Sequence, residues 1–224
     1  MDVMNKINIL FEDNHLLVVE KPINIPVQAD DSKDEDLLEL LKLYIKEKYQ
    51  KPGNVYLGLV HRLDRPVGGV MVFAKTSKAA SRLSEQVRLN QLNKVYHAVV
   101  LGKLEKDEDH LVDYLLKDHK TNTTIVSKDK EAKRSELDYK VVKTIDNLSL
   151  VEIHLQTGRS HQIRVQFSSR NHPLWGDQRY NTTAKAGEQI ALCATKLEFY
   201  HPITKEKLSF EIDIPNRKPY NLFK

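Results

Sequence analysis

Short apolar segments separated by turn residues are the feature that most constrains the fold of this chain. Two such segments, Ile7 to Phe11 and Leu16 to Glu20, flank the polar sequence Glu12-Asp13-Asn14-His15. From Leu148 to Leu155 apolar and polar residues alternate, which is typical of a strand with one buried face. Short strands joined by turns indicate hairpins rather than crossover helices. We therefore predict an α+β fold with a mostly antiparallel mixed β-sheet core flanked by helices.

The other predicted elements follow from the same periodicities. Helical spacing of leucines predicts a helix over 34–49, and Thr76 or Ser77 is expected to cap a second helix that continues to Leu89. Further strands are predicted at 57–60, 70–74, 95–101, 137–142, 190–195 and 208–212. Because no Pro-, Gly- or Ser-rich linker divides the chain, we predict one domain over residues 1–224, with a core from about 7 to 214.

The charge of the chain permits nucleic-acid binding without requiring it. The net charge is +4 and the pI is near 8.9. The segment from Thr157 to Arg179 carries four arginines against the single acid Asp177. A contact surface for phosphates would lie at this run, although a solvated helix face is the better interpretation of the run taken alone.

Composition also indicates the compartment. No apolar run approaches the roughly 20 residues needed to cross a bilayer. Met1 to Lys6 lacks the layout of a secretory signal. The lone cysteine, Cys193, lies in an apolar segment and has no partner for an internal disulfide. We therefore expect a cytoplasmic monomer with a buried, inert thiol.

The segment from His61 to Gly69 has the composition of a functional loop. It places two basic residues before Asp64, with Arg65 and Pro66 after it and Gly68 and Gly69 before the next strand. Arg62 and Arg65 flank Asp64 and would favour its ionised form. The carboxylate is then either a nucleophile or base, or one member of a structural salt bridge in a turn.

The segment from Gln156 to Arg164 is the second candidate. If Ser160 caps a helix reaching Ser169, Ile163 and Phe167 share its buried face, and His161 and Arg164 share another. Arg164 could then reach a carboxylate or phosphate with its planar fork. The alternative is an amphipathic helix whose arginine extends to solvent.

Together with other segments, these two loops resemble the motifs of the RluA-type pseudouridine synthases. The signature is His61-Arg-Leu-Asp-Arg65 followed by a Gly-rich turn. The flanking blocks that resemble the family, in the same order, are Leu17 to Pro22, Asn93 to Ala98, Thr157 to Arg164, His172 to Asp177, and Leu192 through His201-Pro202. Several blocks in register are far more specific than one.

The resemblance implies a pseudouridine-synthase-like fold and specific roles. Asp64 would attack the flipped uridine or its ribose, and Tyr96 would stack on the base and assist proton removal from carbon. Arg164 would pair with Asp64, Leu192 would pack beside the base, and Arg62 would help to hold the flipped nucleotide. The remaining residues expected to contact the substrate are His61, Arg159 and His161.

The implied reaction isomerises uridine to pseudouridine in structured RNA, either rRNA or tRNA. The base must leave the stack because its glycosidic bond is otherwise out of reach. The rearrangement involves no redox change, so no cofactor is expected. The sequence departs from the family in having Pro66-Val67-Gly68-Gly69 where Thr-Ser-Gly is usual. We also expect the catalytic domain alone, without the small S4-type RNA-binding domain of many relatives.

Two other functions remain open from the residues. The first is a catalytically inactive RNA-binding protein on the same fold. The second is a metal-dependent hydrolase or nuclease, which would need a second carboxylate such as Asp177 or Glu20. His154, His161 and His172 do not have a recognised ligand spacing, so no metal site is predicted.

Overall fold

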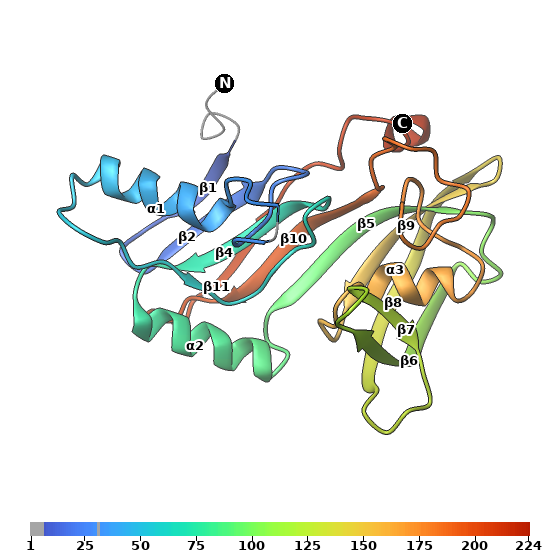
Figure 1. Cartoon of the computed structure of the whole chain (residues 1–224), viewed down its shortest axis with the longest axis horizontal. Coiled ribbons are helices and arrows are strands. Elements are labelled where there is room, and N and C mark those ends of the chain that lie inside the picture. Colours follow the sequence, from blue (N-terminus) through green and yellow to red (C-terminus); the bar gives the residue numbers. More distant parts are fainter. Residues whose placement is uncertain (1–6, 31) are drawn as a thin grey trace. The chain divides into compact units, whose positions relative to one another are not determined.

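The computed structural model describes residues 7–30 and 32–224, and its contacts divide the chain into two compact units (Figure 1). The first unit comprises Met1–Asn93 and Lys196–Ile212, and the second comprises Lys94–Thr195 and Asp213–Lys224. The expectation about Met1 to Lys6 lies outside the described residues. The assignment of residues 1–224 to one catalytic domain stays a prediction.

A sheet forms the centre of the first unit. Its strands follow the order β1-β2-β4-β10, with β11 beside β10 and β3 beside β4. The pairings of β1 with β2, β2 with β4, β3 with β4, and β10 with β11 are all antiparallel. The strands are β1 (Asn8–Glu12), β2 (Leu16–Lys21), β3 (Gly58–Leu59), β4 (Gly68–Ala74), β10 (Leu192–Tyr200) and β11 (Lys207–Glu211).

Helices lie on both sides of this sheet (Figure 1). α1 spans Leu37–Lys48 and α2 spans Ser77–Arg88. Thr76 caps α2 as predicted, because its side chain accepts the N–H of Ala79. The first helix begins later than the predicted residue 34, because the Asp36 side chain accepts the N–H of Glu39 and so fixes the first turn.

The burial of β4 explains this layered arrangement. All seven residues of β4 are buried, so neither face of the strand meets solvent. On one face Val70 and Val72 pack in a cluster that includes Leu83 of α2 and Phe199 of β10. The alternate residues of β4 and β2 point to the other face, where α1 supplies its own buried apolar side chains. A sheet covered on both sides gives the loops at its strand ends a rigid base.

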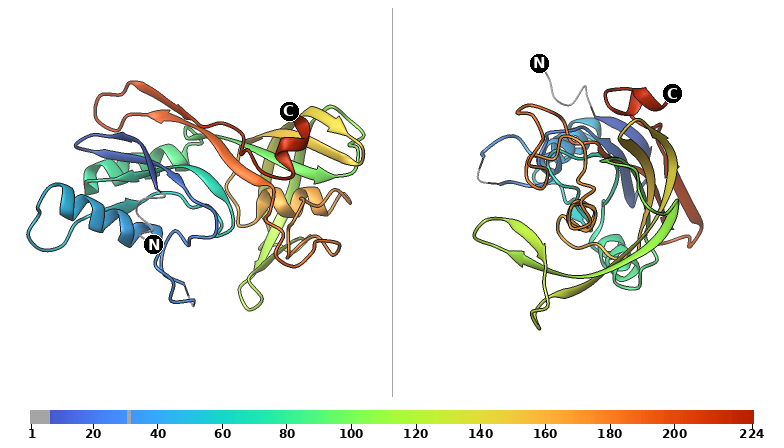
Figure 2. Two further views of the ribbon diagram at one scale, coloured as in Figure 1. Left: turned by 90° about the horizontal axis from the view of Figure 1, so that it is seen from above. Right: turned by 90° about the vertical axis from the view of Figure 1, so that its right-hand side faces the viewer.

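In the second unit the strand order continues from β10 through β5, β9, β8, β6 and β7. The pairings of β5 with β9, β9 with β8, β8 with β6, and β6 with β7 are all antiparallel. α3 (Gln162–Ser168) lies against β6 and β7 (Figure 2). The centre of its Phe167 ring lies 5.4 Å from the centre of the Tyr139 ring in β8. The other elements are β5 (Asn93–Leu101), β6 (Glu108–Asp118), β7 (Thr123–Val126), β8 (Lys133–Ile145), β9 (Leu148–Leu155) and the 3₁₀ helix η2 (Tyr220–Phe223).

The predicted α+β fold, with a mostly antiparallel sheet flanked by helices, is confirmed. Cys193 is buried, as expected. Among the described residues, none of the helices has the length and apolar character required to cross a membrane.

Candidate active site

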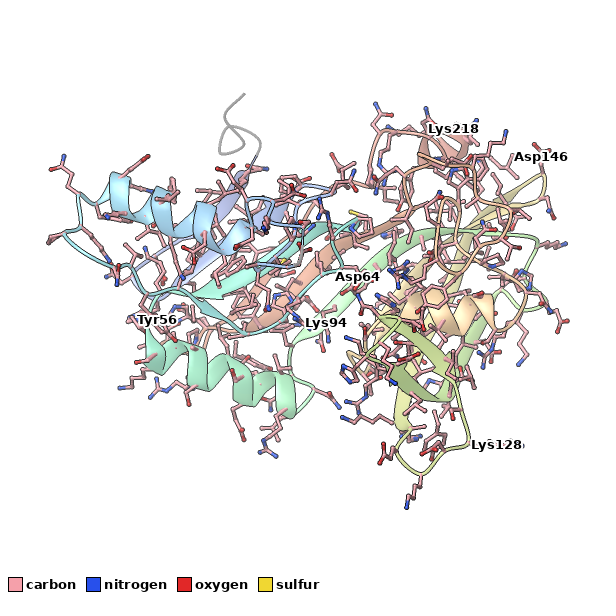
Figure 3. All side chains as sticks on the ribbon, viewed as in Figure 1. Tyr56, Asp64, Lys94, Lys128, Asp146 and Lys218 are labelled. Carbon is pink, nitrogen blue, oxygen red and sulfur yellow. The ribbon has the colours of Figure 1, made fainter. Side chains whose placement is uncertain are left out.

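Asp64 lies on the loop that leads into β4 (Figure 3). The loop is closed by a turn in which the N–H of Val67 donates to the carbonyl of Asp64 over 2.9 Å. Leu63 and Val67 are buried on either side of Asp64, which is itself half-buried. The buried side chains of Leu63 and Val67 therefore fix the backbone on both sides of this carboxylate.

A buried lysine fixes the same loop from within. Lys21, the last residue of β2, has 1% of its surface exposed. Its ammonium donates to the carbonyls of Pro22, Arg65 and Val67 over 2.9, 3.0 and 2.8 Å. Burial lowers the pKa of Lys21 to about 7, against a weaker opposing influence of Asp64. The Lys21 amino group thus lies beneath the turn of Asp64 and joins it to the end of β2.

The two glycines after Val67 are required by the close fit of the loop. Gly69 has a φ of 132°, which side-chain-bearing residues rarely adopt. A Cβ on Gly68 would lie 3.1 Å from the carbonyl oxygen of Lys21. Glycine therefore maintains the connection between the Asp64 loop and β2.

The side chain of Arg65 extends to the acidic segment near residue 32. One terminal nitrogen donates to Ser32 Oγ over 2.8 Å, and the other forms an ion pair with Asp34. Asp30 lies 3.7 Å from the same guanidinium. The Arg65 guanidinium therefore forms its salt bridges with Asp30 and Asp34 of this acidic segment.

The neighbours of Asp64 expected to contact substrate differ in their surroundings. Arg62 is exposed. His61 is half-buried, and its Nε2 accepts the N–H of Val72 in β4 over 3.1 Å. This bond requires an unprotonated Nε2. It also joins the loop that carries Asp64 to the sheet through His61.

In the second unit, Tyr96 and Leu192 lie on strands that neighbour each other. Tyr96 in β5 is 6% exposed and is paired with Ile153 of β9. Leu192 opens β10 and is 4% exposed. β5 and β10 are adjacent, and the N–H of Val99 donates to the carbonyl of Ala191 over 3.1 Å.

The start of α3 differs from the prediction. Ser160 does not cap the helix; His161 occupies the cap position with a φ of 53° and no capping side-chain bond. The Gln162 side chain instead organises the preceding turn, accepting the Arg159 N–H over 3.0 Å and the Thr157 hydroxyl over 2.8 Å. A side chain inside the helix thus replaces the expected cap.

Arg164 does not extend to solvent, so the interpretation of α3 as a surface helix is wrong. Arg164 is 5% exposed and Asp177 is 1% exposed. Arg164 donates from Nε and Nη2 to the two carboxylate oxygens of Asp177 over 2.8 and 2.7 Å. Ile163 and Phe167 share the buried face as predicted. The helix is buried along nearly its whole length because α3 packs between the strands and the 172–181 segment.

Tyr180 contacts both of the α3 residues that were expected to share a face. The Arg164 guanidinium carbon lies 5.1 Å from the centre of the Tyr180 ring. His161 Nδ1 is 2.7 Å from the Tyr180 hydroxyl. Arg159, by contrast, is exposed, and its Nε donates to the carbonyl of Arg134 over 3.2 Å.

The candidate residues therefore fall into two sets. His61, Arg62 and Asp64 belong to the first unit, and the second contains Tyr96, Arg159, His161, Arg164 and Leu192. Within the second unit the structure groups His161 with Arg164 through Tyr180, and Tyr96 with Leu192 through adjacent strands. The pairing of Arg164 with Asp64 stays a prediction.

Sequence reasoning missed three residues of these clusters. The burial of Lys21 could have been predicted from its place at the end of an apolar strand. Because a buried lysine is almost always paired, a partner for its amino group could have been predicted as well. Asp177 was noted as the single acid of a basic run, as part of a family-like block and as a possible metal ligand, but not as a partner of Arg164, and Tyr180 had no distinguishing signal. The carboxylate of Asp177 is instead engaged by Arg164.

Lys94 also lies near a candidate residue. It begins the second unit, two residues before Tyr96, and therefore shares a face of β5 with it (Figure 3). A Cβ on Gly158 would lie 3.3 Å from its Nζ. Burial lowers the pKa of Lys94 below its ordinary value.

No three His, Cys, Asp or Glu side chains are grouped as metal ligands in residues 7–30 and 32–224.

Comparison with known proteins gives consistent similarities. A family model described as RNA pseudouridylate synthase matches residues 15–169. The chain is 35% identical to ribosomal large subunit pseudouridine synthase D of Zymomonas mobilis subsp. mobilis, covering 93% of this chain and 69% of that protein. It is 34% identical to an uncharacterized RNA pseudouridine synthase of Aquifex aeolicus, covering 93% and 70%.

A solved structure has the same fold. Human RNA pseudouridylate synthase domain containing 4 superposes with a TM-score of 0.80 at 22% identity, covering 95% of this chain and 90% of that one.

Proposed function

Because the chain belongs to the family of RNA pseudouridine synthases, which are isomerases acting on RNA, we propose that it converts uridine to pseudouridine with Asp64 as the essential carboxylate. The observation that carries the proposal is an aspartate on a turn held by the buried amino group of a lysine, in a chain that matches the family. Lys21 holds that turn through three carbonyls. A carboxylate at a fixed position is suited to attack a single atom of a bound nucleotide.

The reaction is a rearrangement of one nucleoside. The bond between N1 of uracil and C1′ of the ribose breaks, the base turns, and a bond from C5 to C1′ forms. The proton on C5 is lost and N1 gains one, so atoms and electrons balance without a redox partner. The uridine is flipped out of its stack, because neither bond is accessible within it.

The remaining candidate residues take roles around that base. Arg164 pairs with Asp64 and orients its carboxylate. Tyr96 stacks on the uracil and assists removal of the proton from C5. Leu192 packs beside the ring and Arg62 holds the flipped nucleotide. His61, Arg159 and His161 contribute further contacts to the RNA.

The names of the relatives support one class of RNA as the substrate. The proteins of Zymomonas mobilis and Nitrosomonas europaea are named for the ribosomal large subunit. This favours ribosomal RNA as the first substrate to test, with transfer RNA as the second. We also propose that the protein is a cytoplasmic monomer that needs no cofactor.

Substitution of Asp64 tests the mechanism. Large-subunit rRNA and bulk tRNA transcribed in vitro with tritium at C5 of uridine would release tritium to water as pseudouridine forms. We expect release by the unmodified protein from at least one RNA, and none by Asp64→Ala or Asp64→Asn.

Two results would contradict the proposal. Tritium release by both Asp64 variants at the unmodified rate would eliminate the assigned mechanism. RNA binding by the unmodified protein without release from either RNA would favour the inactive RNA-binding alternative.

A further inference from the structure

The guanidinium of Arg164 is held in one plane by a buried carboxylate. Both oxygens of Asp177 are engaged, by Nε at 2.8 Å and by Nη2 at 2.7 Å. The exposed fractions of the two side chains are 6% for Arg164 and 0% for Asp177. Two parallel bonds fix the direction as well as the position of a guanidinium, which a single bond cannot do.

Tyr180 contacts the same guanidinium from another side. The ring centre lies 5.1 Å from the guanidinium carbon of Arg164. The ring is itself tethered, because its hydroxyl accepts the N–H of Thr124 in β7 over 2.8 Å and bonds His161 at 2.7 Å. Asp177 Oδ1 also accepts the backbone N–H of Tyr180 at 3.3 Å. One carboxylate thus orients the arginine and shapes the turn that carries the ring.

Stability alone is a weak reason for such a pair. Removing two charges from water is costly, and a packed apolar pair of similar volume is often as stable. An arginine has five N–H donors, so bonds from Nε and Nη2 leave Nη1 and the second Nη2 hydrogen to serve other acceptors. The contacts with Asp177 and Tyr180 determine where those donors point.

We propose that Asp177 and Tyr180 are positioning residues for the isomerisation, which act by fixing the plane of the Arg164 guanidinium. The inference rests on the proposed function, in which Arg164 pairs with the reacting carboxylate. Asp177 and Tyr180 do not touch the uridine. Their loss misdirects Arg164 and lowers the rate of the chemical step.

A substitution of equal size at Asp177 tests the proposal. Asp177→Asn keeps the volume but loses the negative charge and at least one of the two acceptors for Arg164. We expect kcat, measured by tritium release from C5-labelled large-subunit rRNA, to fall by about 100-fold, or about 2.7 kcal/mol of barrier. KM should change by less than about threefold, because Asp177 does not contact the RNA.

Asp113→Asn is the matched control. Both carboxylate oxygens of Asp113 also accept from an arginine, Arg170, which lies just after α3. Arg170 Nη1 donates to Oδ2 over 2.7 Å and Nη2 donates to Oδ1 over 3.3 Å, and Asp113 does not contact Arg164. Its substitution should leave kcat within about twofold of the unmodified value. Rates are normalised to the folded fraction from circular dichroism, so that lost stability is not counted as lost catalysis.

A double-mutant cycle separates positioning from general stabilisation. A lysine at position 164 has no planar fork for Asp177 to orient. In an Arg164→Lys background, Asp177→Asn should therefore lower kcat by less than about threefold. A 100-fold loss in both backgrounds would mean that Asp177 acts independently of Arg164 and would overturn the proposal.

A spectroscopic measurement tests the orientation without activity. The Nε–H resonance of Arg164 in ¹⁵N-labelled protein should exchange slowly with water, and in Asp177→Asn its exchange should accelerate at least tenfold. If Asp177→Asn fails to fold, Tyr180→Leu serves instead, because it removes the ring and leaves the carboxylate pair intact. We expect kcat to fall about tenfold in that variant, and more than in Tyr180→Phe.

The outcomes distinguish the two levels of argument. If the unmodified protein releases no tritium, the proposed function fails, and the Arg164 exchange rates still test the orientation. If the unmodified protein is active and Asp177→Asn, or Tyr180→Leu in its place, retains full kcat, the positioning role is wrong and the proposed function stands.

Discussion

The sharpest test of the Asp64 loop is to remove the Lys21 amino group beneath it. Lys21→Met keeps the length and apolar stem of the side chain but deletes three bonds, to the carbonyls of Pro22, Arg65 and Val67. A buried carbonyl left without a donor costs about 1–3 kcal/mol; the bond to Val67 is buried and those to Pro22 and Arg65 are partly buried, so the three together cost at most about 9 kcal/mol. Taken alone, this loss would destabilise the protein severely.

An opposite term of similar size offsets that loss. Burial lowers the pKa of Lys21 from 10.5 to about 7. At about 1.4 kcal/mol per pH unit, the folded environment disfavours the charged form by about 5 kcal/mol, and methionine removes that cost. We therefore expect the free energy of unfolding to change by less than about 4 kcal/mol, while the freed turn displaces Asp64 and lowers kcat by about 10- to 100-fold.

The same lysine makes the free energy of unfolding depend on pH in a direction that can be predicted. Between pH 7 and 10.5 the unfolded chain holds the Lys21 proton and the folded chain has released it. The unfolded state then binds more protons, so the free energy of unfolding rises with pH across this window. Lys21→Met should lack that rise.

Urea unfolding at pH 7 and pH 9.5, with tritium release at pH 7, measures both effects. Lys75→Met is the control, because the Lys75 side chain is only 7% exposed and donates to a carbonyl, that of Asp13 over 2.6 Å, away from the Asp64 loop. It should lower stability and leave kcat within about twofold. Full kcat in Lys21→Met, or an unchanged pH slope, would refute the reasoning.

Three further predictions concern other parts of the fold. Burial raises the pKa of Glu12, but the bonds from Lys48, Lys75 and two tyrosines outweigh it and lower that pKa to about 2. The stabilisation from ionised Glu12 is therefore fully present above pH 4.5 and is lost as the pH falls toward 2. Acid unfolding of Glu12→Gln, followed by circular dichroism, should lack this loss of stability between pH 4.5 and 2. Gly69→Ala forces an alanine into a φ of 132° and should lower the free energy of unfolding by about 1–3 kcal/mol, measured in urea, whereas an unchanged value would show that the loop adapts. Phe167→Ala should cost about 3–5 kcal/mol by the same measurement, because the ring is 1% exposed, and a cost below about 1 kcal/mol would mean that the cavity collapses.

The sequence predicted those features that depend on neighbouring residues. Strand periodicity located β1, β2 and β9 within a residue or two, and the Thr76 side chain identified the start of α2. The start of α3 was wrong because a glutamine inside the helix, Gln162, organises the turn before it. Its bonds depend on the folded path of the loop and leave no local pattern.

The candidate site divides in the same way. Asp64 and Arg164 were assigned roles from the motif blocks, whereas Lys21 and Asp177, which lie in other blocks, were not linked to them. Lys21 is 43 residues from Asp64 in the chain, and it reaches the loop only because β2 pairs with β4. Asp177 meets Arg164 only after the chain has passed α3 and returned. Long-range pairing produces both contacts, and one-dimensional periodicity does not encode it.

The division of β10 between the two units has a consequence for synthesis of the chain. Residues 192–195 belong to the second unit and 196–200 to the first, so a nascent chain lacking them has neither sheet complete. Until Leu197 and Phe199 emerge, the apolar face formed by Leu16, Val18 and Val72 lacks two of its core partners. Most of the polypeptide must therefore leave the ribosome before either half can reach its final stability, and helper proteins that shield apolar surface have their longest opportunity to act in that interval.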